Sequence, residues 1–83
     1  MYESPEREVN IGANKIDFFG LAGGAQFSPS QIIDMTPIEV NEHIAGTSIV
    51  SCYLSQIGVP QVVWFNNNNE VKTVKFKAII KYI

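Results

Sequence analysis

His43 and Cys52 are the two side chains in this sequence that could pair as a thiol nucleophile and its base. That chemistry needs the thiol and the imidazole within hydrogen-bond reach, and usually a third group that orients the base. Nothing in the spacing supplies the third group. A lone cysteine behaves mostly as a small hydrophobic residue, which is the interpretation we favour here. Because no motif assembles an acid, a base and a nucleophile, we expect the protein not to be an enzyme.

Glu39 and His43 stand four residues apart, so on a helix they would share a face and could reach one metal ion. Two ligands do not make a metal site. Asp34 or Glu42 could serve as a third ligand, but the spacing does not demand it, and a solvated face explains all four residues. With Cys52 as its single cysteine, the chain also lacks a cysteine cluster for zinc or iron. We therefore expect no metal and no cofactor.

Four lysines in the last twelve residues form the most concentrated charge of the chain: Lys72, Lys75, Lys77 and Lys81. A basic strand could contact phosphates or an acidic partner. Lysines are also the residues that natural sheets place on exposed strands to discourage pairing with other chains. We favour solvation, and we keep Lys75, Lys77 and Lys81 as candidate contacts to a partner.

Trp64 and Phe65 could offer a stacking platform for single-stranded nucleic acid. A tryptophan that anchors a small core is the commoner arrangement, and we favour it. Trp64 is kept as a candidate contact residue, and nucleic acid is the second choice of partner after protein.

The segment "FFGLAGGAQF", residues 18–27, combines apolar side chains with three glycines. It lacks the Gly-Lys-Ser/Thr ending of a phosphate-binding loop, and its glycines do not have the dinucleotide spacing. We expect an apolar loop that packs against a neighbour, in this chain or in another. Phe18, Phe19 and Leu21 are therefore candidate contact residues.

Charged residues make up 17% of the chain, well below the roughly 25% that is usual for soluble domains. Protein contact surfaces are depleted in Lys, Glu and Asp, so this composition favours assembly. An alternative of nearly equal weight is that Ser, Asn and Gln solvate the surface. Residues 44–69 contain no charged side chain. Their serines and glutamines, with Gly58 and Pro60, argue for a buried segment and against a membrane span.

The net charge is −2, but the charges are unevenly distributed along the chain. Acidic residues predominate in the first half, and four lysines lie within the last twelve residues. We expect the acidic half to face the basic strand within the fold. The start of the chain is acidic and polar, unlike a secretory signal. We expect no membrane association and a cytoplasmic location, which would be the host cytoplasm or the virion if the protein is virus-encoded.

The clearest helix signal is "TPIEVNEHIAG", where Thr36 can cap, Pro37 takes the first helical position and Glu39 completes a capping box. This pattern predicts a helix over residues 37–45, ended by Gly46. A weaker copy predicts a single turn over 29–34. Residues 48–57 fit either a helix or a strand, and their β-branched residues lead us to favour the strand.

The remaining segments predict strands. Residues 8–11 and 15–21 are joined by a tight reversal. From Val74 onward, alternate residues are apolar and the lysines lie between them, which is typical of a strand with one dry face. Residues 62–65 are apolar throughout, which favours a strand packed on both faces, and Asn66 to Asn69 suit a turn. We therefore predict a C-terminal hairpin of residues 60–66 and 70–82.

Together these elements predict a small α+β domain over residues 7–83, after a disordered start over 1–6. It would be rich in strand, with an antiparallel sheet and one capped helix. The alternative is a winged helix-turn-helix, if residues 48–57 are helical and the final hairpin forms a wing. That alternative lacks basic residues on the reading helix. For function, we expect an interaction or assembly module, a small accessory protein that contacts another protein or copies of itself through an uncharged face.

Overall fold

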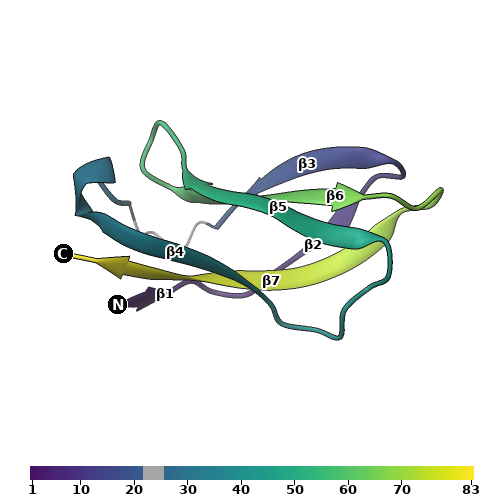
Figure 1. Cartoon of the computed structure of the whole chain (residues 1–83), viewed down its shortest axis with the longest axis horizontal. Coiled ribbons are helices and arrows are strands. Elements are labelled where there is room, and N and C mark those ends of the chain that lie inside the picture. Colours follow the sequence, from purple (N-terminus) through teal and green to yellow (C-terminus); the bar gives the residue numbers. More distant parts are fainter. Residues whose placement is uncertain (22–25) are drawn as a thin grey trace.

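The computed structural model describes residues 1–21 and 26–83, and these form strands arranged in two antiparallel sheets (Figure 1). A three-residue 3-10 helix precedes the fourth strand. The elements, in chain order, are β1 (Tyr2–Glu3), β2 (Arg7–Ile11), β3 (Lys15–Gly20), η1 (Pro29–Gln31), β4 (Ile32–Glu39), β5 (Thr47–Leu54), β6 (Pro60–Asn66) and β7 (Lys72–Tyr82).

The four-stranded sheet is built around β7, which pairs with β4 on one side and with β1 and β2 on the other. In this sheet Val9 lies opposite Val74, and Pro37 lies opposite Ala78. The three-stranded sheet is built around β6, which lies between β3 and β5. Both termini lie at the same end of the molecule, because β1 pairs with the last part of β7 (Figure 1).

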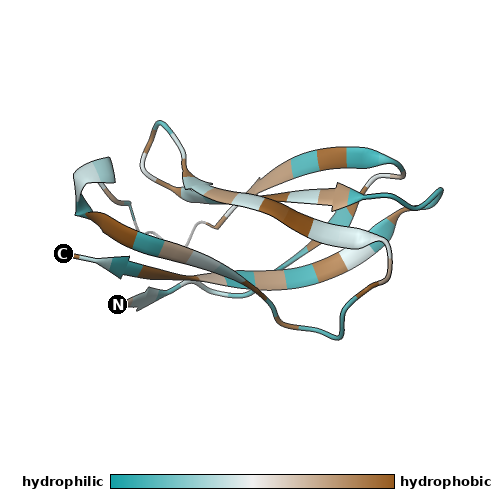
Figure 2. Cartoon of the chain, in the orientation of Figure 1, coloured by the Kyte–Doolittle hydropathy of each residue, from teal (hydrophilic) through white to brown (hydrophobic). Residues whose placement is uncertain are grey.

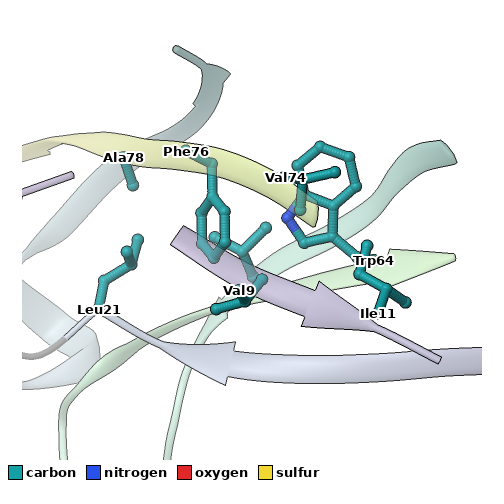
Figure 3. Packing of buried hydrophobic residues seen from close by; sticks show 8 residues of the cluster. Val9, Ile11, Leu21, Trp64, Val74, Phe76 and Ala78 are labelled. Carbon is teal, nitrogen blue, oxygen red and sulfur yellow. The ribbon is translucent and has the colours of Figure 1, made fainter. Parts of the chain in front are cut away.

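The core lies between the two sheets, and the predicted alternation of the last strand is confirmed. In β7, every second residue from Val74 to Ile80 is buried, while Lys75 and Lys77 lie on the other face. Figure 3 shows Phe76 and Trp64 pointing into the cluster, with their ring centroids 5.7 Å apart. The buried apolar residues are Val9, Ile11, Leu21, Val62, Trp64, Val74, Phe76, Ala78 and Ile80.

The predicted helix over residues 37–45 is wrong, because its first residues belong to β4. The capping pattern is compatible with a short helix, but an isolated helix of this length is marginal in water. Pairing with β7 instead satisfies the backbone and places Met35 and Pro37 on the core side. Residues after Glu39 lead through an irregular segment to a turn at Gly46, which has a φ of 81°.

A proline inside β4 is tolerated for a specific reason. Ala78, which lies opposite Pro37, directs its own polar groups to the other side of β7. Its N–H donates to Ser4 Oγ at 2.8 Å, and its carbonyl accepts from Ser4 N at 2.9 Å. The nitrogen of Pro37 therefore points away from β7, to the edge of the sheet, where a missing N–H leaves no ladder bond unmade.

The strands of the predicted C-terminal hairpin exist, but they do not pair, so the hairpin is wrong. β6 uses both of its edges for β3 and β5, and β7 uses both of its edges for the other sheet. The turn after Asn66 therefore leads from one sheet to the other. Similarly, the reversal at residues 12–14, where Asn14 has a φ of 53°, connects strands of different sheets.

The α+β class and the winged-helix alternative are both overturned. Residues 47–54 form a strand, as favoured for most of 48–57, and the longest helix among the described residues is η1. The predicted single turn over 29–34 is limited to η1, where Ser28 N donates to Gln31 Oε1 at 2.8 Å. Within residues 1–21 and 26–83, no helix has the length and apolar character needed to cross a membrane.

The start of the chain, for which the sequence predicts disorder, contributes to the four-stranded sheet. Tyr2 and Glu3 pair with Ile80 and Ile79. Ser4 is buried.

Candidate functional site

The outer face of the three-stranded sheet, which we call the neutral face, carries no charged side chain in the rows that pair across β3, β6 and β5. Antiparallel partners point to the same side of a sheet, so the pairing defines the rows. The three outward rows are Ile16, Phe65 and Ser48; Phe18, Val63 and Ser51; and Gly20, Gln61 and Tyr53.

Apolar side chains on the neutral face are exposed to an unusual degree. Ile16 is 65% exposed, Phe18 60% and Tyr53 40%. Val63 and Phe65 lie between them and are only partly covered. Single exposed apolar residues are normal on proteins, but a contiguous apolar patch marks a contact surface.

The register of β3 is opposite to the one that burial would favour. Lys15, Asp17 and Phe19 pair with the inward residues of β6, whereas Ile16 and Phe18 pair with the outward ones. The alternation of polar and apolar residues along this strand is visible in Figure 2. A shift of one residue would turn Ile16 and Phe18 to the core side, whereas Lys15 and Asp17 are exposed in the present register already. A strand that leaves two large apolar side chains in solvent is a local conflict of the kind expected at functional sites.

A shallow, open hollow continues the neutral face at the end nearest the β5–β6 turn. Phe18 and Tyr53 form its wall on the sheet, and Ile57 from the turn is also exposed. The turn is fixed by Gly58, which has a φ of 81°. The hollow is lined by Phe18, Tyr53, Leu54, Ser55, Gln56, Ile57 and Gln61, all of them uncharged.

The outer face of the four-stranded sheet, in contrast, is charged, and its lysines have acidic neighbours. Lys77 forms an ion pair with Glu3, and Lys75 Nζ lies 3.4 Å from Glu6 Oε1. The hydrogen bond from Lys77 to Glu3 raises the pKa of that lysine. Lys81 lies opposite Asp34 in the register. The expectation that the acidic half of the chain faces the basic strand is confirmed.

The other candidate contact residues lie mostly inside. Trp64 and Leu21 are buried in the core, and Phe19 packs against it. Arg7 from β2 reaches over the Phe19 ring, with its guanidinium 5.7 Å from the ring centre, and donates to the Gly20 carbonyl. Of the three candidates from the apolar segment, only Phe18 is on the neutral face.

The residues considered for chemistry do not assemble a site. His43 Nδ1 lies 2.9 Å from Glu39 Oε1, at the end of β4 and in the following loop instead of on a helix. Among the residues that the structure describes, no group of three or more His, Cys, Asp or Glu is placed to hold a metal ion. Burial raises the pKa of the Cys52 thiol to about 11, so the group is protonated at neutral pH.

The free sheet edges carry features that oppose pairing with another strand. β4 turns the nitrogen of Pro37 to its open edge, as described above. β5 contains a bulge between Ile49 and Ser51. β3 directs Lys15 and Asp17 to the core side. Proline, bulges and inward-pointing charges on edge strands are recognised ways to prevent edge-to-edge association.

Residues 22–25 of the apolar glycine segment lie outside the described part of the chain. Sequence reasoning missed Ile16, Val63 and Tyr53 as surface residues, although the uncharged run 44–69 does supply two of the three strands of the neutral face. Comparison of the chain with known protein families, with curated proteins and with solved structures finds no match.

Proposed function

We propose that this protein is a non-enzymatic interaction or assembly module that binds another protein chain through the neutral face. The observation that carries the proposal is the pairing of β3 with β6, which exposes Ile16 and Phe18 on the same face as the partly covered Val63 and Phe65. A bound partner would cover these apolar side chains.

The free energy gained by covering Ile16 and Phe18 is large enough to support binding of a partner. Covering a large apolar side chain completely is worth about 1.5–3 kcal/mol. Ile16 and Phe18 are each about three-fifths exposed, so covering both contributes roughly 2–4 kcal/mol. That range corresponds to a change of about 30-fold to 1000-fold in affinity.

The lysine face is a weaker candidate. Lys75 and Lys77 are engaged with Glu6 and Glu3, which offsets their attraction for phosphate. Trp64, which was considered as a stacking residue, has no exposed surface. Within residues 1–21 and 26–83, no contact favours a nucleic-acid partner.

A pair of matched variants tests the proposal. Ile16→Thr/Phe18→Thr makes the neutral face polar, whereas Val71→Thr alters a residue that is also 60% exposed but lies in the turn before β7. Each protein is immobilised, and association is measured with extract of the source cells and with the purified chain itself. We expect wild type and Val71→Thr to retain the same partner and the double variant to lose it. Equal retention by all three proteins would refute the proposal.

A further inference from the structure

Strand β6 has the composition of a strand that is packed on both faces. Val62 and Trp64 are fully buried between the two sheets. Val63 and Phe65, which point the other way, are also apolar but only partly covered. A strand that is apolar throughout usually has a further layer of structure on each face. The described residues form two sheets, so no third layer covers the neutral face within residues 1–21 and 26–83.

The size of the neutral face matches one helix. Three strands about 4.8 Å wide give a width of about 14 Å, and the five residues 61–65 of β6, at about 3.4 Å each, give a length of about 17 Å. An α-helix with its side chains is about 10–12 Å in diameter, and three turns, or about eleven residues, are about 17 Å long. The face measures roughly 240 Å² in projection, whereas each partner in a stable complex of two folded domains commonly buries about 800 Å². One helix of three turns therefore covers the face, and a second domain would extend well beyond it.

An extended segment matches the face less well. Neighbouring strands are about 4.8 Å apart, so one extended segment lying on the face would cover about one of its three strands. Added to an edge of the sheet instead, it would meet the bulge of β5 or Lys15 and Asp17 on β3. Both features oppose strand pairing. A helix is thus the form in which a single segment contacts β3, β6 and β5 together.

The heights of the outward side chains place such a helix. β3 contributes the large residues Ile16 and Phe18, and β5 contributes Ser48 and Ser51 to the same two rows. Val50, the extra residue of the β5 bulge, is 57% exposed beside Ser51. The lowest path along the face therefore lies over the two serines, between the large residues of β3 and Val50.

We infer that the neutral face binds an amphipathic helix of about three turns, from another protein, that runs parallel to β6 and rests on Ser48 and Ser51. This inference rests on the proposed function and names the form of its partner. Apolar residues spaced at i, i+3, i+4 and i+7 line one side of a helix, and helices dock on apolar surfaces through such a stripe. The buried side of this helix must be uncharged, because the three rows offer no charged partner. Its flank at the β3 edge can carry charge, since Lys15 and Asp17 are exposed there.

The probe is a display library of overlapping fragments encoded by the source genome, each of about 24 residues, which is enough for three helical turns with flanking chain. The library is selected on the immobilised protein, and the recovered fragments are synthesised and titrated against three variants. Ile16→Thr/Phe18→Thr removes one flank of the seat. Ser51→Phe fills the seat while it adds apolar area. Val71→Thr is the control, because Val71 is 60% exposed but lies in the turn before β7.

We expect the recovered fragments to gain helical circular dichroism on binding, and to lose binding when proline replaces a residue in the middle of the apolar stripe. The double variant should bind them about 30-fold more weakly or worse, and Ser51→Phe about tenfold more weakly, because its added ring overfills the contact. Val71→Thr should bind as wild type does. The substituted side chains are exposed, so circular dichroism and Trp64 fluorescence of each free variant should match those of wild type.

Fragments that bind without gaining helix overturn the inference. A Ser51→Phe protein that binds them as tightly as wild type also overturns it, because a surface that is merely adhesive gains from added apolar area. Self-association of the wild type that the double variant abolishes would identify a second copy as the occupant instead. If no fragment is recovered, the inference is wrong, even where extract of the source cells yields a whole protein that binds. That whole protein decides the proposed function, which stands if the double variant loses it and fails if the double variant retains it.

Discussion

Replacing Asn66 by alanine should destabilise the fold more than any change on the surface of the molecule. The Asn66 side chain is completely buried at the point where the chain leaves the three-stranded sheet. Its Nδ2 lies 3.0 Å from the Ile11 carbonyl, 3.2 Å from that of Gly12 and 3.0 Å from that of Glu70. Its Oδ1 accepts from the Asn68 backbone N–H at 2.9 Å. One amide therefore connects the β2–β3 turn with the β6–β7 turn.

The expected loss follows from these contacts. A typical hydrogen bond contributes about 1 kcal/mol net, and a buried carbonyl left without a donor is penalised by about 1–3 kcal/mol. Three carbonyls, the Asn68 backbone N–H and the Asn68 side-chain amide each lose a hydrogen bond in Asn66→Ala, so we expect a loss of about 3–4 kcal/mol. A chain of 83 residues has a total stability of roughly 4–12 kcal/mol, so this loss is a large fraction of it.

Urea unfolding followed by Trp64 fluorescence measures this loss, because Trp64 is fully buried in the folded state. Asn67→Ala is the matched control, since Asn67 is the next residue and its side chain is exposed; we expect its effect to stay within about 0.5 kcal/mol. If Asn66→Ala lowers the free energy of unfolding by less than about 1 kcal/mol, the role assigned to Asn66 is wrong.

Three further predictions concern the turn after β5, the cysteine and the lysine face. Gly58→Ala should cost about 2 kcal/mol or more in urea unfolding, because φ is +81° and a Cβ there would lie 2.5 Å from the Phe27 carbonyl oxygen; a loss below about 0.5 kcal/mol would contradict this. Cys52 should react with a thiol reagent far more slowly in the folded protein at pH 8 than in urea, because burial raises its pKa to about 11. Since that pKa is higher folded than unfolded, the group should lower stability as pH rises from about 9 to about 11, and Cys52→Ser should remove this dependence. Lys77→Gln should reduce stability only slightly at low salt and not at all in 1 M NaCl, because its ion pair with Glu3 lies on the outer face of the sheet and the Glu3 side chain is exposed; a loss that persists in salt would show that packing, not charge, is responsible.

Strand β7 shows what sequence alone can predict. Its alternation of apolar and lysine residues fixes both the extended conformation and the buried face, because side chains on a strand repeat every two residues. The opposite charges of the two halves of the chain also indicate the ion pairs of Glu3 and Glu6 correctly. The first signal lies within one strand and the second is a sum of charges over each half of the chain. Neither depends on knowing which strands are neighbours.

The errors arise where neighbours decide the outcome. Thr36, Pro37 and Glu39 have the types and spacing of a helix start, but pairing of β4 with β7 overrides this local preference. Asn66 looks like one of four equivalent turn residues, yet only its position between two sheets makes it a buried link. The pairing of β6 with β3 and β5, instead of with β7, is likewise a property of the assembled sheets.

The neutral face could be predicted only in part. An uncharged surface follows from the composition and from the run without charge over residues 44–69. The side on which Ile16 and Phe18 lie does not follow, because the apolar pattern of β3 favours turning them inward. The structure identifies these residues as exposed through the pairing of β3 with β6.

The connections from β2 to β3, from β4 to β5 and from β6 to β7 each carry the chain from one sheet to the other. Neither layer can thus be assembled from one continuous piece of the chain, and the four-stranded sheet needs both the first and the last residues that the structure describes. Folding must close long loops before stabilising contacts form, which slows it relative to helical proteins of this size. A cut in any of these three connections should release strands from both layers at once, so we expect limited proteolysis to yield intact chain and small peptides without a stable intermediate fragment.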